Sequence, residues 1–324
     1  MSSRPEIVLV NLGTPAAPTP DGVRSFLAEF LADPDVVDWP RWIWMPVLKG
    51  IILRRRPARV AELYASIWTG DGSPLAASTV ALARDLARHV GDRATVSHAY
   101  RYGAPAAADV IREARARASR VIVVPLFAQP TASSSGTVER LARRVASESE
   151  GAPVVVHHMP PDDAHYIGAV AKRCEEALAA LPDGPAPHLL ASFHSLPARV
   201  DRKEGRRYTS ACLRTVEALG RALGQTAPTV EVAYQSRFGP EPWLGPATEG
   251  RLVALARAGV RRVVVAAPGF LTPGLETLEE LGVRGREAFQ AAGGEDFALV
   301  EAPAGRPELL RALAASLETA AAPL

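Results

Sequence analysis

Short apolar runs, rich in β-branched residues, alternate with longer amphipathic segments along this chain. The runs cover residues 7–10, 121–127, 154–157, 189–193, 230–234 and 263–267. Between them, apolar side chains recur every four residues, as at Leu82, Leu86 and Val90, which is the spacing of one helix face. Because strands and helices alternate in this way, the chain is predicted to form parallel sheets covered by helices.

A weak internal repeat divides the chain into two similar halves. Residues 96–105 resemble residues 232–240, and residues 120–127 resemble residues 262–270. Each half then holds a strand, a loop with tyrosine and arginine, a helix, and a second strand that ends at proline and phenylalanine. We therefore predict an α/β fold of two similar Rossmann-like lobes, each a doubly wound parallel sheet, that face a central cleft.

Three segments follow from this repeat. Residues 1–155 are predicted to form an N-terminal lobe with a tryptophan-rich lip, and residues 156–304 a C-terminal lobe. Residues 305–324 are predicted to form a last helix, and the sequence does not determine whether this helix packs on the first lobe. With 324 residues, of which 48% are hydrophobic, the chain can bury the cores of two ordinary domains.

Charge and cysteine content exclude several classes of protein. The formal net charge of +2 gives no electrostatic footprint for nucleic acid. The two cysteines, Cys174 and Cys212, exclude a disulfide scaffold and cannot supply the four ligands of an all-cysteine iron–sulfur cluster. The N-terminal residues contain no long apolar segment or small-residue cleavage site, which predicts a cytoplasmic location.

Residues 39–53 are unusually apolar and contain three of the five tryptophans. The segment is too short and too interrupted to span a bilayer, which needs about 20 apolar residues. Together with Arg54, Arg55 and Arg56, it fits either a buried packing element or a surface that enters the lipid headgroup region. We favour the second, a peripheral contact of residues 39–56 with the inner face of the cytoplasmic membrane.

His194 follows the predicted strand at 189–193, and Pro197 ends that strand. The imidazole is therefore expected at the carboxyl end of a strand, where open α/β sheets bind ligands. Residues 234–246 and 268–280 are predicted to lie on the same rim, so that a base, an aromatic loop and an acidic helix start share one cleft. Taken alone, His194 also fits a hydrogen-bonded core histidine.

Two glutamates lie near the start of the helix that follows this rim. Thr272 is expected to be its N-cap, with Pro273 at the first helical position. Glu276 and Glu280 are one turn apart on one face, so each hinders the ionisation of the other and the pair can pass a proton outward. An acidic helix start stabilised by the helix dipole is the structural alternative.

Other motifs lack the spacing that their chemistry requires. The loop at 11–15 has no Gly-x-Gly-x-x-Gly pattern for a nucleotide, and no Gly-x-Ser-x-Gly elbow of a serine hydrolase occurs. His157, His158 and His165 do not match a structural zinc spacing and are interpreted as surface residues. The loop at 133–137 opens a helix and can hold a carboxylate or phosphate through its backbone N–H groups.

Six ordered blocks of sequence resemble one protein family. They are residues 8–15, 29–34, 72–75, 192–197, 234–246 and 268–280, the last with the run Leu-Glu-Thr-Leu-Glu-Glu. From about Ile7 to the final helix, the chain resembles the ferrochelatases, which insert ferrous iron into a porphyrin in haem synthesis. The fold that this resemblance implies, two Rossmann-like lobes with the porphyrin in the cleft, agrees with the internal repeat.

The resemblance assigns catalytic roles in the second lobe. Metal insertion requires the loss of two pyrrole N–H protons and bending of the macrocycle. His194 matches the family's essential histidine, which takes pyrrole protons or presents the metal, and an imidazole can do either. Glu276 matches the essential glutamate and is, with His194, the expected metal contact. Glu280 matches the next acid along the helix, which carries protons or metal to and from solvent.

The resemblance also implies a set of porphyrin-binding residues. They are Asn11, Leu12, Arg101, Tyr102, Ser133, Phe270 and Trp243. Asn11 and Leu12 would line the floor of the site, and Arg101 would lie on the opposite face of the ring from His194. Tyr102 and Phe270 would contact the ring, whereas Trp243 would support packing.

The chain departs from the family pattern at three positions. Pro273 and Gly274 stand where bacterial members commonly carry an acid and a cysteine, so an acidic relay must start at Glu276. Pro130 replaces a tyrosine of the family, which removes one expected ring contact.

The expected reaction is insertion of ferrous iron into protoporphyrin IX, giving protohaem and two protons. Asn11 and Leu12 in the first loop resemble the protoporphyrin enzymes, whereas coproporphyrin enzymes usually place an aromatic residue there. The lip at 39–53 likewise resembles the protoporphyrin enzymes. Iron is then a substrate, and neither a tightly bound cofactor nor an iron–sulfur cluster is expected. A coproporphyrin III ferrochelatase, a cobalt chelatase and a non-catalytic tetrapyrrole carrier remain alternatives, and the sequence predicts no oligomeric state.

Overall fold

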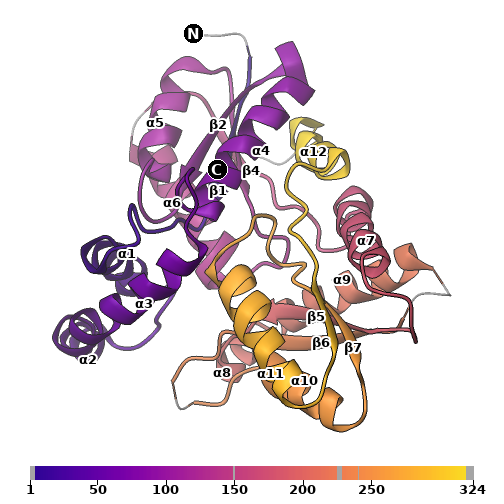
Figure 1. The fold of residues 1–324 in the computed structure, drawn as a ribbon. Helices are drawn as coiled ribbons and strands as arrows, with labels where there is room; N and C mark the ends of the chain where they lie inside the picture. Colours follow the sequence, from indigo (N-terminus) through magenta and orange to yellow (C-terminus); the bar gives the residue numbers. More distant parts are fainter. Residues whose placement is uncertain (1–3, 149, 225–227, 240, 319–324) are drawn as a thin grey trace. The chain divides into compact units, whose positions relative to one another are not determined.

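Two four-stranded parallel sheets form the framework of the chain (Figure 1). The computed structural model describes residues 4–148, 150–224, 228–239 and 241–318. The first sheet, in the order β2-β1-β3-β4, consists of β1 (Glu6–Asn11), β2 (Thr95–Tyr100), β3 (Val121–Pro125) and β4 (Val154–Val156). The second, in the order β6-β5-β7-β8, consists of β5 (His188–His194), β6 (Val230–Gln235), β7 (Arg262–Ala266) and β8 (Asp296–Leu299). The equal strand orders confirm the predicted α/β fold of two similar doubly wound lobes.

Contacts between residues divide the chain into two compact units. The first comprises the chain up to Met159 and from Leu313 onward, and the second comprises Pro160–Ala312. Each unit contains one sheet. In the first unit, the short helix η5 (Ala315–Glu318) contacts β3, and Arg120 donates a hydrogen bond to the carbonyl of Leu317 (3.2 Å).

Helices pack on the sheet of the first unit. Successive side chains of its strands point to opposite faces of the sheet, and both faces carry buried side chains. The unit contains α1 (Pro20–Ala32), α2 (Arg41–Val47), η1 (Leu48–Ile52), α3 (Leu53–Ile67), α4 (Pro74–Val90), η2 (Gly91–Arg93), α5 (Ala107–Arg117), η3 (Ala132–Gly136) and α6 (Thr137–Glu148). Ile111 of α5 and Leu141 of α6 share a core with Val8 and Val123. The helix α4 contacts β1 and β2.

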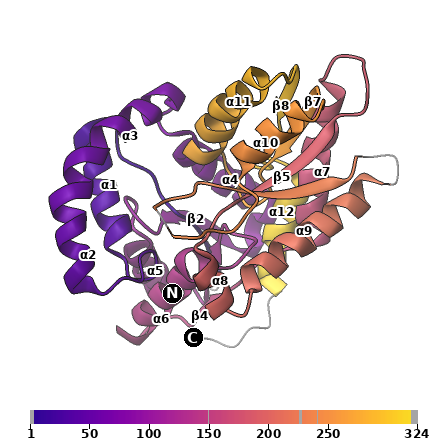
Figure 2. The ribbon, with the colours of Figure 1, turned by 90° about the horizontal axis from the view of Figure 1, so that it is seen from below.

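The tryptophan-rich segment forms a helical layer beside α1. Helices α1, α2 and α3 lie side by side (Figures 1 and 2). Trp44 is 6% exposed and donates its indole N–H to the carbonyl of Leu31 (2.6 Å), whereas Trp39 and Trp42 are 46% and 79% exposed. One tryptophan of the segment thus lies in a local core, and two lie at the surface. Among the described helices, none is long and apolar enough to cross a membrane.

The second unit repeats this plan with its own helices. They are α7 (Ala164–Ala179), α8 (Ala198–Lys203), α9 (Arg207–Leu223), α10 (Thr248–Arg257), η4 (Glu276–Gly285), α11 (Arg286–Ala291) and most of α12 (Pro307–Ala314). Leu190 packs with Phe289 of α11 in one core, and its neighbour Ala191 packs with Cys212 of α9 in another. Successive residues of β5 thus face opposite sides, and α7 and α9 lie together, as do α10 and α11 (Figure 2).

All six predicted apolar runs coincide with strands, although three strands end before the runs do. Strand β3 stops at Pro125, β4 at Val156 and β7 at Ala266. Strand β8, which has four residues and begins with the charged Asp296, was not predicted.

Candidate functional site

His194 is the last residue of β5, which lies between β6 and β7. Its Nδ1 lies 2.7 Å from the carbonyl oxygen of Ser195. Because a carbonyl only accepts hydrogen bonds, Nδ1 carries a proton, and in the neutral form of the imidazole Nε2 keeps its lone pair. The hydroxyl of Tyr208 donates to the His194 carbonyl (2.6 Å) and fixes the backbone. The imidazole is therefore oriented with Nε2 able to accept a proton or bind a metal.

The loop after β6 lies along the loop after β5. Ser195 donates its backbone N–H to the carbonyl of Gln235 (2.7 Å), and Leu244 donates to Leu196 (2.9 Å). Residues 192–197 thus share the carboxyl edge of the second sheet with residues 234–239 and 241–246. Trp243, within this loop, buries an indole N–H that has no hydrogen-bond partner among the described residues.

Glu276 and Glu280 lie on η4, a π-helix. Hydrogen bonds in a π-helix join residues five apart, so two residues four apart fall within one turn and project in similar directions. The predicted N-cap at Thr272 is wrong, because the first helical carbonyl belongs to Gly274, which accepts from Leu278 (3.0 Å). The Thr277 hydroxyl accepts from the Gly274 N–H (2.9 Å) and closes the turn there.

Two residues at the end of β6 hold this π-helix, and the sequence analysis gave neither a role. The Gln235 amide donates to the carbonyl of Glu276 (3.2 Å) and accepts from Ser192 (2.6 Å). Ser236 donates its backbone N–H to one oxygen of Glu280 (2.7 Å) and its hydroxyl to the other (2.5 Å). The carboxylate of Glu280 is thus held by two donors of one residue.

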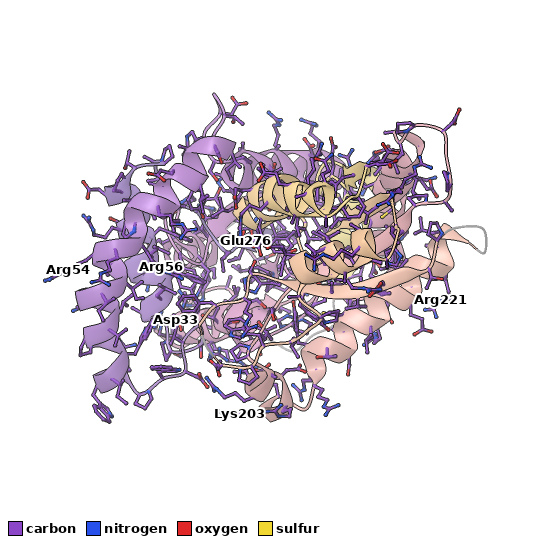
Figure 3. All side chains as sticks on the ribbon, turned by 60° about the horizontal axis from the view of Figure 1, so that its bottom comes forward. Asp33, Arg54, Arg56, Lys203, Arg221 and Glu276 are labelled. Carbon is purple, nitrogen blue, oxygen red and sulfur yellow. The ribbon has the colours of Figure 1, made fainter. Side chains whose placement is uncertain are left out.

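Glu276 has the most distinctive electrostatic environment of the site. Desolvation raises the pKa of its carboxyl group above the usual 4.5, the charge of His194 opposes this rise, and the charge of Glu280 adds to it. The structure therefore brings His194, Glu276 and Glu280 into one electrostatic cluster in the second unit, with Glu276 at the first residue of η4 (Figure 3). A carboxyl group with a raised pKa exchanges protons at a less acidic pH than an ordinary glutamate.

Phe270 lies apart from these hydrogen bonds, in the turn that follows β7. It is half-buried, and its backbone N–H donates to the carbonyl of Ala267 (3.0 Å).

A cavity of about 640 Å³ in the same unit is lined by residues of α7, α11 and β8, and by none of the predicted site residues.

Four predicted porphyrin contacts lie together in the first unit, where the loops after β1 and β2 pair. Arg101 donates its backbone N–H to the carbonyl of Asn11 (2.8 Å), and Tyr102 donates to that of Leu12 (2.9 Å). The close approach requires Gly13, which has a φ of +114°, and a Cβ there would lie 1.8 Å from the Tyr102 carbonyl oxygen.

The side chains of this group differ in exposure. Leu12 and Arg101 are half-buried, whereas Asn11 is 4% exposed and donates to Thr79 (2.9 Å). Tyr102 is 1% exposed, and desolvation raises its pKa, so its hydroxyl stays a donor. Ser133 lies in η3, where its hydroxyl is 3.1 Å from that of Thr131.

The Tyr102 hydroxyl donates to Asp33, an acid that the sequence analysis did not single out. Burial acts to raise the pKa of Asp33, but the Asp35 N–H, the Tyr102 hydroxyl and the charge of Arg101 outweigh it and hold that pKa below its usual value. Asp33 belongs to the block 29–34. A buried acid within a family block was the available signal for it.

Potential metal ligands are few in the described part of the chain. Among the described residues, no group of three or more histidine, cysteine, aspartate or glutamate side chains could hold a metal ion. His194 and Glu276 remain the two candidates that the geometry brings together.

Comparison with solved structures defines the class of fold. SirB from Bacillus subtilis, in a structure with Fe³⁺, is 13% identical with a TM-score of 0.55, over 98% of this chain and 96% of that one. DR2241 from Deinococcus radiodurans, described as structurally similar to chelatases, is 14% identical with a TM-score of 0.53, over 98% of this chain and 55% of that one. These similarities concern the fold alone, which is that of the chelatases.

Comparison of sequences is more specific. The family described as Ferrochelatase matches residues 5–321. A ferrochelatase of Azoarcus sp. strain BH72 is 43% identical over 96% of this chain and 86% of its own length. A ferrochelatase of Edwardsiella ictaluri is 40% identical over 93% of this chain and 94% of its own. The chain belongs to the ferrochelatase family, whose members are metal chelatases that insert ferrous iron into a porphyrin, and the predicted resemblance is confirmed.

Proposed function

We propose that this protein inserts ferrous iron into protoporphyrin IX, with release of two pyrrole protons, to give protohaem. The single observation that carries the mechanism is the cluster of His194 and Glu276 at the carboxyl edge of the second sheet. An imidazole with a free Nε2, next to a carboxyl group of raised pKa, can accept protons and can bind a divalent cation.

The charges balance through these groups. A porphyrin loses two N–H protons when it binds Fe²⁺, so the metallated ring gains no net charge. His194 Nε2 takes pyrrole protons or presents the metal, and Glu276 exchanges protons with it. Glu280, held by Ser236, lies one step farther along η4 and passes protons toward solvent. Iron acts here as a substrate, and we propose no resident cofactor and no iron–sulfur cluster.

The proposal includes a set of porphyrin-binding residues. They are Asn11, Leu12, Arg101, Tyr102, Ser133, Phe270 and Trp243. The half-buried Leu12 and Arg101 offer direct contacts, whereas the buried Asn11 and Tyr102 support the loop that presents them. Trp243 supports packing of the loop beside His194.

We also propose a cytoplasmic location, in which the lip (residues 39–56) makes a peripheral contact with the inner face of the cytoplasmic membrane. Trp39, Trp42 and Ile51 are exposed, and Arg54 points away from α3 (Figure 3). Exposed tryptophans beside basic side chains suit the headgroup region of an anionic bilayer. Protoporphyrin is poorly soluble in water, so a membrane contact suits this substrate.

Steady-state comparison of the two porphyrins tests the choice of substrate. Purified protein is mixed anaerobically with ferrous iron and either protoporphyrin IX or coproporphyrin III, and the absorption change on metallation is followed. We expect kcat/KM to favour protoporphyrin at least tenfold, because Leu12 offers an aliphatic contact to vinyl groups. Faster turnover of coproporphyrin would reverse the assignment, and metallation of neither would reject it.

A further inference from the structure

We propose that Asp33 is a positioning residue that fixes the guanidinium of Arg101 for porphyrin binding, an inference that rests on the proposed function. Asp33 is the C-cap of α1 (Figure 3) and is not itself one of the catalytic or porphyrin-binding residues named above. Its side chain is 7% exposed and that of Arg101 is 17% exposed.

Four donors converge on the Asp33 carboxylate. Oδ2 accepts from Arg101 Nη2, from the Tyr102 hydroxyl (2.9 Å) and from the Thr137 hydroxyl (3.0 Å). Oδ1 accepts from the backbone N–H of Asp35 (2.8 Å). The donors come from the end of α1, the loop after β2 and the start of α6, so one carboxylate joins three elements of the first unit.

Thr137 completes the arrangement. Its hydroxyl accepts from Arg101 Nε (2.8 Å) while it donates to Asp33. One edge of the guanidinium is therefore bound at both Nε and Nη2, and the guanidinium lies 4.6 Å from the centre of the Tyr102 ring. Its plane and its position are fixed by three neighbours.

The remaining end of the guanidinium is what a ligand would meet. Among the described residues, no hydrogen bond from Arg101 Nη1 to another side chain or carbonyl occurs, and the side chain keeps its partial exposure. An ion pair that served stability alone would gain most by satisfying every N–H of the guanidinium. Here one edge is immobilised and the other is left for a partner, as expected of a group organised before binding.

Variants of the full-length chain test this role. Asp33→Asn removes the charge at constant shape, and Thr137→Val removes the bridging hydroxyl; Thr137→Ser retains that hydroxyl. Asp35→Asn is the matched control, because the same charge is lost two residues away, where it pairs with Arg140 (2.7 Å), and the backbone N–H to Asp33 remains. The dissociation constant of protoporphyrin without iron, KM and kcat with ferrous iron, and Tm are measured.

We expect Asp33→Asn and Thr137→Val to raise the dissociation constant and KM about 10–100-fold, the range of a lost supporting contact, with kcat at saturating porphyrin changed less than about threefold. Thr137→Ser restores most of the affinity, and Asp35→Asn binds like the unchanged protein. In an Arg101→Ala background, Asp33→Asn adds little, because the residue through which it acts is absent.

Three results would overturn the proposal. The first is that Asp33→Asn and Thr137→Val both fold and bind porphyrin normally, and the second is that Asp33→Asn lowers porphyrin affinity equally in the Arg101→Ala background. The third is that the variants lower Tm without changing the dissociation constant or KM. If Asp33→Asn fails to fold, the Thr137 pair decides. Failure of the proposed function is distinguishable, because a chain that binds porphyrin without metallating it still allows the binding comparison. A chain that binds no porphyrin rejects both.

Discussion

At the scale of one residue, Glu276 provides the site with a carboxyl group of raised pKa and lowers the stability of the fold at neutral pH. Because desolvation raises its pKa above 4.5, the folded state holds this proton more tightly than the unfolded state. Stability contributed by the neutral acid is present below pH 4.5 and is lost as the pH rises toward the folded-state pKa. Above that pKa, the half-buried carboxylate remains a cost to folding.

Glu276→Gln should therefore raise Tm at pH 7 by a few degrees, a shift that corresponds to about 1 kcal/mol, and should have little effect at pH 4. Thermal unfolding at both pH values checks this expectation. The neighbouring Glu279→Gln is the contrast, because it breaks the ion pair with Arg284 (2.8 Å) and should lower Tm. A lower Tm of Glu276→Gln at pH 7 would show that the carboxylate stabilises the fold.

Single residues were predictable where their chemistry depends on position along a strand. His194 follows an apolar strand and stands at its carboxyl end, as expected. Thr272 failed as a cap because Gly274 and Thr277, a glycine and a hydroxyl three residues apart, close the helix start instead. Asp33 was missed because its four donors come from three separate segments, so that its place in the block 29–34 was the signal that the sequence offered.

Elements with continuous apolar runs were predictable, and edge elements were less so. Central strands such as β1 and β5 are buried on both faces, and apart from the two end residues of each strand and Ser192 they consist of apolar residues. The edge strand β2 contains half-exposed polar residues, so the repeat rather than the periodicity indicated it. The edge strand β8 is short and begins with a charge, and its three apolar residues are too few to show the period of a strand.

The π-helical form of η4 was also outside the reach of sequence patterns. An α-helix and a π-helix place apolar residues at similar spacings over ten residues, so periodicity does not separate them. The bonds that distinguish this segment come from another element, since Gln235 holds the carbonyl of Glu276 and Ser236 holds Glu280. The direction in which the two glutamates point is thus set by the end of β6.

At the scale of the whole chain, the two units repeat one plan with different chemistry. In both units, the backbone N–H of a tyrosine near the end of the equivalent strand donates to a proline carbonyl. Tyr100 donates to Pro105 (2.8 Å), and Tyr234 donates to Pro246 (2.9 Å). The intervening loop is longer in the second unit. In the first unit this loop supplies Arg101, whereas in the second it supplies the residues that hold the glutamates, so the repeated fold carries different roles.

The lip gives the chain a surface whose function can be measured apart from catalysis. Trp42 is 79% exposed, so Trp42→Ala should lower binding to vesicles containing anionic lipid about three- to tenfold, because an exposed tryptophan contributes on the order of 1 kcal/mol at the interface. Leu213→Ala, 52% exposed on α9 of the second unit, is the matched control. Sedimentation with vesicles measures both, and equal binding by Trp42→Ala and the unchanged chain would remove the lip from the membrane.

The most direct test of the central claim is anaerobic metallation of protoporphyrin by the His194→Ala chain. Single-turnover absorption traces are recorded for the unchanged chain, for His194→Ala, and for His165→Ala, which alters an exposed histidine of α7. We expect His194→Ala to bind porphyrin but to insert iron about 10²–10⁴ times more slowly, while His165→Ala behaves like the unchanged chain. Metallation by His194→Ala at the unchanged rate would contradict the account.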